Sequence, residues 1–352
     1  MVLLHGDLAF RLPMQRGDDV RQTQLALARA GVFTGAADGV FGPMTRDAVI
    51  AFQTRIHASN PKIVVDGIVG RDTWSALFPA DAPVGTSAGI SAPPSVTRAA
   101  LPPDQPPWRI TLGTYLPRLT APHGPPLGPG PKQWQLTPQG VCVDGDQTPP
   151  RTQGEPATAT HVWKSFRPAL EKCAAAYGVP VELLIATACT ESGGDPSKCR
   201  QEPGFVSDDS TPNKVSPGLM QTLIETARSA TGDPTLTRDR LFDPETSIRA
   251  GAAYIAGQAT RSRVPTGFDP PLVAIAYNAG SLRQAENPPP ANSWGLVQTD
   301  RGGGMMHADA FVQYFNDTFA VLAGDPPNAL TPSLWTLQQP PPGQAEAPSA
   351  GM

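Results

Sequence analysis

Charged residues are scarce in this sequence: Asp, Glu, Lys and Arg make up 16% of its 352 residues, where about a quarter is usual. The formal net charge is −4 at pH 7, so the chain has neither the basic field of a nucleic-acid-binding protein nor a polybasic patch for a membrane surface. The longest apolar stretch, residues 181–189, is far shorter than the roughly 20 residues that span a bilayer. We therefore expect no nucleic-acid partner and no membrane span.

Cysteine and histidine are also rare. The four cysteines, Cys142, Cys173, Cys189 and Cys199, lack the C-x-x-C spacing of zinc sites and are too few for a disulfide scaffold. The five histidines contain no H-E-x-x-H motif, and neither His161 nor His307 lies in a motif that would activate a cysteine nucleophile. We expect no metal centre, no cofactor and no cysteine nucleophile. Cys173 and Cys189 are interpreted as buried hydrophobes, and a bridge from Cys189 to Cys199 is the alternative.

Proline is abundant instead, and it is unevenly distributed. Residues 79–156 contain 18 of the 42 prolines, and residues 325–352 contain another 7. Each proline ring fixes φ and removes a backbone donor, so we expect an extended linker over 79–156 and a tail over 325–352. Residues 108–116 alternate in polarity as a strand would, and residues 108–120 are the part of the linker that would dock on a neighbouring domain. Two domains remain, at residues 1–78 and 157–324.

The first domain contains an internal repeat, because residues 38–45 recur as residues 66–73. Each copy begins with Asp-Gly, which favours a tight turn, and reaches a second glycine just before an expected helix start. Apolar residues at helical spacing precede the first copy, as at Val20 and Leu27, and follow it, as at Val49 and Phe52. The pattern predicts a small helical bundle.

Residues 15–78 resemble the peptidoglycan-binding module of type 1. The resemblance rests on the two Asp-Gly turns and on the segments 17–20, 48–53 and 73–77, with Gln24, Leu27 and Gly31. It implies a three-helix bundle that holds the bacterial cell wall non-covalently in a groove between helices and turns. Thr23 stands where the family usually has leucine, a small loss of core packing. No single ligand-contacting residue is assigned.

The second domain is expected to consist of successive amphipathic helices. An apolar stripe from Val162 ends at Gly178, with Pro168 inside it as a kink or a later start. Pro180 opens a short apolar helix that runs from Val181 to about Glu191. Later helices begin at two Asp-Pro pairs, Asp243-Pro244 and Asp269-Pro270, in which the aspartate is expected to cap the helix and the proline to take its first position. The last helix carries Phe311, Phe315, Phe319 and Leu322.

Glu191 closes this apolar helix. Apolar neighbours and the negative end of the helix dipole both favour the protonated carboxyl. A carboxyl held neutral near neutral pH donates a proton to a glycosidic oxygen, the general-acid step of sugar cleavage. On local context alone, a solvated glutamate at a helix end is the favoured interpretation, and the surrounding motifs reverse that preference.

Four motifs in order resemble the soluble lytic transglycosylase domain of the goose-type branch of the lysozyme-like superfamily. They are Glu191-Ser192-Gly193, residues 218–221 (Gly-Leu-Met-Gln), residues 241–254 and residues 276–280 (Ala-Tyr-Asn-Ala-Gly). The resemblance implies a mainly α fold in which a three-helix peptidoglycan-binding bundle and a proline-rich linker precede an α-helical lysozyme-like domain. It also implies cleavage of the β(1→4) bond between N-acetylmuramic acid and N-acetylglucosamine, with Glu191 as acid and then base. The product would be an anhydromuramyl end.

The same resemblance assigns supporting roles. Ser192 would orient or cap the glutamate, Met220 and Gln221 would line the sugar cleft with the Gln221 amide available to the N-acetyl group, and Tyr277 and Asn278 would lie across it. All five residues are expected to bind substrate. Met220 is equally well explained as core. Residues 198–209 form an insertion relative to the family, expected as a loop at the rim of the cleft.

One carboxylate suffices for a transglycosylase, whereas ordinary glycosidases use two. Asp208 or Asp209 in the insertion would supply a second one, which would make the enzyme a hydrolysing muramidase. A non-catalytic wall-binding protein of degenerate lysozyme-like fold is the alternative from another class.

Residues 1–7 lack the cationic start and apolar core of a standard secretory signal. We therefore expect synthesis in the cytoplasm and action on the periplasmic cell wall. The protein would reach the wall as a phage endolysin released by lysis, or as a component of a phage particle or contractile injector.

Overall fold

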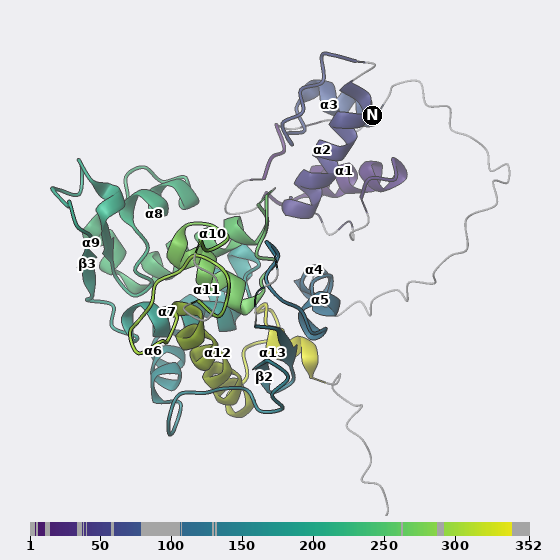
Figure 1. Cartoon of the computed structure of the whole chain (residues 1–352). Coiled ribbons are helices and arrows are strands. Elements are labelled where there is room, and N and C mark those ends of the chain that lie inside the picture. Colours follow the sequence, from purple (N-terminus) through teal and green to yellow (C-terminus); the bar gives the residue numbers. More distant parts are fainter. Residues whose placement is uncertain are drawn as a thin grey trace, which may run out of the picture. The chain divides into compact units, whose positions relative to one another are not determined.

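The chain divides into two compact units, unit 1 (residues 1–111) and unit 2 (residues 112–352) (Figure 1). The computed structural model describes residues 4, 6–10, 15–33, 37, 39, 41–57, 60–78, 106, 108–128, 130, 132–261, 263–286 and 292–339. Helices dominate these residues, so the expected mainly α fold is confirmed. Linker residues 79–105, tail residues 340–352, and Asp38 and Val40 of the repeat lie outside the described part.

Within the described residues up to Phe78, unit 1 contains three helices, as predicted: α1 (Asp18–Arg29), α2 (Pro43–His57) and α3 (Arg71–Leu77). Its core contains the expected side chains Val20 and Leu27 from α1 and Val49 from α2. The two repeats add Phe41 and Val69, which are both fully buried. Each repeat therefore contributes an apolar plug to the same core, which is why the pattern recurs.

A buried glutamine holds each repeat to the helix before it. Gln24 of α1 accepts a hydrogen bond from the backbone N–H of Gly39 at 2.8 Å and donates to Thr45 Oγ1 at 3.0 Å. Gln53 of α2 accepts from the N–H of Gly67 at 2.8 Å and also donates to the matching threonine of the second copy. Both turn glycines have positive φ, 72° and 74°, a region that favours glycine.

Unit 2 begins with a segment that we call the strap, residues 112–156. Helix α4 (Trp108–Gly113) leads into it, and α5 (Leu116–Thr120) and the antiparallel strands β1 (Trp134–Thr137) and β2 (Gly140–Val143) follow. The expected strand over 108–116 is therefore wrong. The buried residues Trp108 and Leu112 are four apart, the spacing of one helix face. The expected extended linker also does not continue to residue 156.

The strap is held by three side chains of one later helix of unit 2, α12 (His307–Gly324). The amide of Asn316 accepts from the N–H of Val141 at 2.7 Å and donates to the carbonyls of Val141 and Pro150 at 3.0 and 2.7 Å. Thr152 donates to Asp317, and Lys132 pairs with Asp309 at 2.6 Å. The strap is thus an integral part of unit 2.

Asp269 was expected to cap a helix with its side chain, but it binds the strap instead. Its carboxylate accepts from Trp134 Nε1 at 2.8 Å and lies 2.7 Å from His123 Nε2, and the residue is only 1% exposed. His123 Nδ1 lies 2.7 Å from the carbonyl of Ala121. With an acceptor at each ring nitrogen, His123 suits the doubly protonated form.

We expect the stability of unit 2 to depend on pH through His123. Burial lowers the pKa of His123, but the hydrogen bond and the charge of Asp269 and the Ala121 carbonyl outweigh it, so the pKa is raised above 6.5. A raised pKa contributes stability that is complete below pH 6.5 and is lost as the pH rises through the folded-state pKa. Thermal melts of the full chain should therefore show unit 2 less stable at pH 8.5 than at pH 5.5. His123→Gln should remove about 1 kcal/mol of this difference, and an unchanged difference would contradict it.

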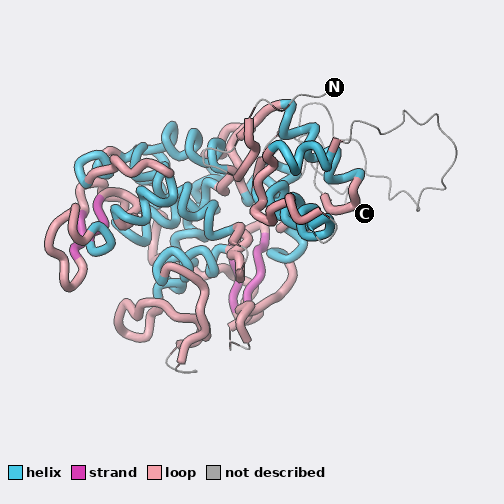
Figure 2. Tube along the Cα trace, turned by 90° about the horizontal axis from the view of Figure 1, so that it is seen from above, coloured by secondary structure: helices cyan, strands magenta, loops and turns pink. Residues whose placement is uncertain are grey.

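The remaining elements of unit 2 are mostly helices, coloured cyan in Figure 2, and β3 and β4 form the second strand pair. They are α6 (Ala157–Tyr177), α7 (Val181–Ser192), β3 (Cys199–Gln201), the 3-10 helix η1 (Pro212–Lys214), β4 (Val215–Pro217), α8 (Ile224–Thr231), α9 (Arg238–Phe242), α10 (Pro244–Ala259), α11 (Pro270–Ala279), α12 (His307–Gly324) and α13 (Leu334–Gln338). Helix α6 continues through Pro168 and ends at Gly178 with φ 65°. Helix α7 is the centre of the unit and packs against α6 and α12. In the described part of the chain, no helix is long and apolar enough to cross a membrane.

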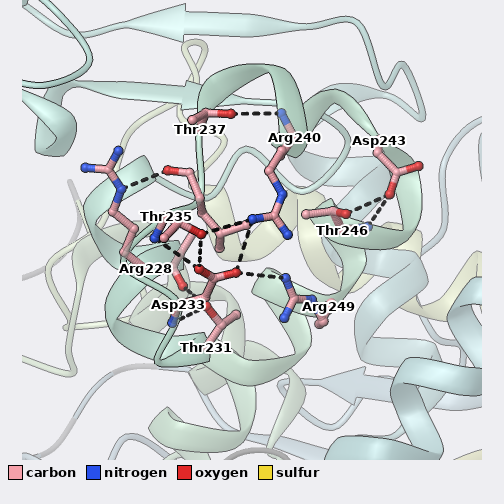
Figure 3. A network of polar contacts seen from close by, with 11 residues as sticks. Arg228, Thr231, Asp233, Thr235, Thr237, Arg240, Asp243, Thr246 and Arg249 are labelled. Carbon is pink, nitrogen blue, oxygen red and sulfur yellow. Dashed lines mark hydrogen bonds and ion pairs between the residues drawn. The ribbon is translucent and has the colours of Figure 1, made fainter.

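A polar corner joins α8 and α9 to α10 (Figure 3). Asp233 accepts from the N–H and hydroxyl of Thr235 at 3.0 and 2.6 Å and forms ion pairs with Arg240 and with Arg249 of α10. These hydrogen bonds lower the pKa of Asp233. As predicted, Asp243 caps α10 by accepting from the N–H of Thr246 at 2.8 Å. The corner fixes the helix on which the cleft motif at 218–221 rests.

Residues 325–339 were assigned to the tail, but they pack on unit 2 through α13. The carboxylate of Glu182 is fully buried and accepts from Ser333 Oγ at 2.5 Å and from the N–H groups of Leu334 and Trp335 at 3.2 and 2.9 Å. Burial raises the pKa of Glu182, although these three donors favour its charged form. The carboxylate thereby holds the start of α13 against α7.

Glu182→Gln should lower the free energy of unfolding of unit 2 by about 1–3 kcal/mol, because a neutral amide offers one acceptor oxygen to three donors. Urea unfolding of the full chain measures the effect. Ser333→Ala, which removes only one donor, should cost less. A Glu182→Gln variant as stable as the wild type would show that α13 is held in another way.

Candidate active site

Glu191 is placed by the last turn of α7. Every other residue of this helix is buried, and the side chain of Glu191 keeps 18% of its exposure. The helix ends at Gly193 and Gly194, which have φ 70° and 83°. A Cβ at Gly194 would lie 2.9 Å from Val162, so glycine allows the chain to turn close against α6. An otherwise buried helix therefore presents one carboxyl at its end.

His307, the first residue of α12, contacts this carboxyl. Its Nε2 lies 3.2 Å from Glu191 Oε1, and its side chain is 6% exposed. The same Nε2 has no hydrogen-bond partner among the described residues, so this is a close approach to Glu191 without the geometry of a hydrogen bond. In the sequence, His307 was interpreted only as a possible partner of a cysteine, and no motif links it to Glu191.

The motif at residues 218–221 forms a tight turn. Gly218 has φ 83°, and a Cβ there would lie 1.9 Å from the carbonyl oxygen of Leu241, so only glycine fits. Gln221 has φ 47°, and its amide donates to the carbonyls of Lys198 and Gly218 at 2.9 and 2.8 Å. The Gln221 side chain therefore holds the turn against the β3 strand region, whereas we had expected its amide to face the sugar.

Met220 is fully buried. It packs on Gly251 of α10, where a Cβ would lie 2.6 Å from the Met220 methyl group. Its backbone N–H donates to Ser247 Oγ at 3.0 Å. The alternative interpretation of Met220 as core residue is the one that fits its burial.

Tyr277 of α11 closes the other side of this turn. Its hydroxyl donates to the carbonyl of Met220 at 2.9 Å and lies 2.7 Å from Thr222 Oγ1. Burial raises the pKa of Tyr277 well above 10. The Thr222 hydroxyl opposes the rise, and the negative charge of Glu191 adds to it. The phenol therefore stays protonated, within electrostatic reach of Glu191.

Asn278 anchors the segment between α11 and α12. Its Oδ1 accepts from the N–H and the hydroxyl of Thr299 at 2.9 and 3.0 Å. Two residues on, Arg301 donates to the carbonyl of Thr190 at 3.1 Å, at the negative end of α7. The segment thus brings a cation next to Glu191 that no sequence motif indicated.

Two family models match this chain. Residues 16–77 match a model described as "Putative peptidoglycan binding domain", and residues 168–289 match one described as "Transglycosylase SLT domain". The chain carries a transglycosylase SLT domain. It is an enzyme of the lytic transglycosylase type that degrades peptidoglycan, with a peptidoglycan-binding module ahead of its catalytic domain. The expected two-module layout is thereby confirmed.

The SLT match begins after the strap and ends before His307. The strap and His307 therefore belong to unit 2 but lie outside the matched segment. Ser192 lies within the match, but it is fully buried, and its hydroxyl donates to the carbonyl of Ala188 at 2.9 Å and accepts from the N–H of Gly194 at 3.2 Å. It caps the helix end, and the expected contact with substrate does not fit its burial.

The acidic residues of the insertion in this SLT domain either form ion pairs with arginines or are exposed to solvent. Asp208 accepts from both Nε and Nη2 of Arg238, and Arg238 also lies over the ring of Phe205. Glu202 pairs with Arg200 at 3.0 Å, and Asp209 is exposed. The two carboxylates that we considered as a second catalytic group thus differ: Asp208 is held by an arginine, and Asp209 faces solvent.

All four cysteines are free thiols, so the alternative bridge from Cys189 to Cys199 is not formed. Cys142, Cys173 and Cys189 are buried and Cys199 is exposed. Burial raises the pKa of Cys173 to about 12 and raises that of Cys189 still further. These two cysteines are buried hydrophobes, as predicted.

Proposed function

We propose that Glu191 is the general acid and general base of a transglycosylase that cleaves the β(1→4) bond between N-acetylmuramic acid and N-acetylglucosamine without water. The observation that carries this proposal is the placement of one partly exposed carboxyl at the end of an otherwise buried helix. It lies within electrostatic reach of Tyr277, whose hydroxyl contacts the turn at 218–221. A partly buried carboxyl in such a place is suited to give and retake a proton.

In the first step, the Glu191 carboxyl donates its proton to the glycosidic oxygen, and the bond from that oxygen to C1 of the muramyl residue breaks. In the second step, the primary hydroxyl of the same muramyl residue attacks C1, and Glu191 accepts the hydroxyl proton. One C–O bond is broken and one is formed, the glutamate returns to its protonated state, and no second carboxylate is required.

The surroundings of Glu191 fit this chemistry. Asp208 is neutralised by Arg238, which makes it a poor base for activating water. Tyr277 and Gln221 would keep the turn at 218–221 in shape beside the sugar. The amide nitrogen of Asn278, whose oxygen is occupied by Thr299, would be the donor offered to the substrate.

The test is the chemistry of the products. Purified cell-wall sacculi are digested with the full chain, and the released fragments are separated and weighed by mass spectrometry. We expect anhydromuramyl ends, which are lighter by one water than hydrolysed ends. Reducing ends would replace the proposal by a muramidase mechanism, and no soluble fragments would contradict an active enzyme.

A further inference from the structure

We propose that His307 is a positioning residue for Glu191. In the substrate complex, the Glu191 carboxyl turns so that Oε1 accepts from His307 Nε2–H, and the catalytic proton is held on the other carboxyl oxygen, Oε2. This inference rests on the proposed function, because it assigns the geometry of the same acid. It adds a residue from outside the segment that matches the SLT family, at the start of the last long helix.

The pair is close and largely removed from solvent. Nε2 and Oε1 are 3.2 Å apart, and the two side chains keep 6% and 18% of their exposure. In the free protein this contact lacks hydrogen-bond geometry, and Nε2 has no hydrogen-bond partner among the described residues. A buried imidazole N–H without an acceptor is costly, so a small turn of the nearby Glu191 carboxyl that supplies one is favourable.

The position of His307 is set by its backbone neighbours. The N–H of His307 donates to the carbonyl of Thr299 at 3.0 Å, and the N–H of Ala308 donates to Gln298 Oε1 at 2.8 Å. Asp309 accepts from the N–H of Met306 at 2.8 Å. The first turn of α12 is thus fixed from the preceding segment on both sides of the histidine.

Asp309 links this turn to the strap and to the segment before α12. It pairs with Lys132 at 2.6 Å and accepts from Trp294 Nε1 at 3.0 Å. Helix α12 also packs along α7, the helix of Glu191. The imidazole is therefore held rigidly, which a residue that orients another group requires.

A hydrogen bond from His307 Nε2–H to Glu191 Oε1 determines which oxygen of the carboxyl carries the acidic proton. The carbonyl oxygen of a protonated carboxyl is a better acceptor than its hydroxyl oxygen, so an Nε2–H on Oε1 favours the acidic proton on Oε2, the oxygen that donates to the glycosidic oxygen. After that transfer the carboxylate is charged, and the hydrogen bond to Oε1 becomes a charge-assisted one, which is stronger. The proton of His307 stays on Nε2 throughout, and Glu191 regains its own from the muramyl hydroxyl.

The experiment compares substitutions at His307 in the full chain, with kcat and KM measured on a soluble glycan-strand fragment. His307→Phe keeps a flat ring without a donor and should lower kcat about 10- to 100-fold, the worth of one hydrogen bond to a charged group, with KM within about twofold. His307→Gln places an amide N–H near the position of Nε2 and should restore most of kcat. The control, His161→Gln on the exposed surface of α6, should behave as the wild type.

Further variants separate the outcomes. His307→Asn carries its amide too far from Glu191 and should share the defect of the phenylalanine variant, which keeps the test valid if His307→Phe does not fold. Wild-type kcat in His307→Phe or His307→Asn, beside an inactive Glu191→Gln, would overturn the role of His307 and leave the proposed function intact. An active Glu191→Gln would overturn both. Equal loss in His307→Gln and His307→Phe would show that the histidine has only a structural role.

Discussion

Glu191→Gln should lower the rate of peptidoglycan cleavage by at least about 100-fold, because general acid–base catalysis contributes on the order of 10²–10⁴ to a rate. The amide is nearly isosteric with the carboxyl, and its oxygen can take the place of Oε1, which lies 3.2 Å from His307 Nε2 in the wild type. It has no acidic proton to give to the glycosidic oxygen. The substitution therefore removes the chemistry and preserves the packing at the end of α7.

The measurement is release of soluble fragments from sacculi per unit time, with co-sedimentation of the protein on the same sacculi as the second readout. Binding should be unchanged, because unit 1 carries the peptidoglycan-binding module. Glu225→Gln is the matched control, since Glu225 is an exposed glutamate of α8 in the same unit. A Glu191→Gln variant that still releases fragments at the wild-type rate would show that another group is the acid.

Removing the strap should prevent unit 2 from folding. A chain of residues 157–339 lacks the buried strap side chains Leu119, Trp134, Leu136, Val141 and Val143. Each is worth about 1.5–3 kcal/mol when fully buried, so their sum is comparable with the 5–15 kcal/mol that stabilises a whole domain. The amide of Asn316 would also lose its partners in the strap.

Circular dichroism melts and digestion of sacculi would compare residues 157–339 with residues 106–339. We expect the shorter chain to lack a cooperative melt and activity, and the longer chain to have both. In the full chain, Trp134→Ala should destabilise unit 2 by about 3–5 kcal/mol, whereas Trp74→Ala, in the core of unit 1, should leave the melting of unit 2 unchanged. A cooperative, active 157–339 would mean that the strap is dispensable.

The helices of both units could be predicted because their signals are local. Gly178 and Gly193 end α6 and α7 with positive φ, and the Asp243-Pro244 pair opens α10 with the expected cap. Apolar periodicity supplied the rest, as in α12, whose phenylalanines are buried. Such signals need only the residues within one or two turns.

The strap could not be predicted because its partners are far away in the sequence. A high proline content indicates a linker when only the segment itself is considered. The contacts of Asn316 with Val141 and of Asp269 with His123 and Trp134 override it. For the same reason Asp269 was expected to cap its own helix. Nothing near Asp269 in the sequence indicates that its carboxylate binds His123 and Trp134 of the strap.

The candidate site was predicted in part. The sequence singled out Glu191, and the resemblance placed the turn at 218–221 and Tyr277 in one family pattern. Burial was not visible in the motifs, so Ser192 and Met220 were assigned to substrate although both are fully buried. His307 was missed because its relation to Glu191 exists only after α12 has packed on α7.

The two units also differ in the sequence separation of the residues that their hydrogen bonds join, and therefore in the time between the synthesis of the two partners. Gln24 of α1 accepts from Gly39, which is only 15 residues later in the sequence. This hydrogen bond of unit 1 can therefore form as soon as the unit has been synthesised. The hydrogen bond between Val141 and Asn316 spans 175 residues, which at roughly 5–20 residues per second is a delay of about 10 to 35 s. Through that interval the apolar face of the β1–β2 hairpin has no α12 to cover it, so the order of synthesis makes the strap the segment of the growing chain most in need of protection from aggregation.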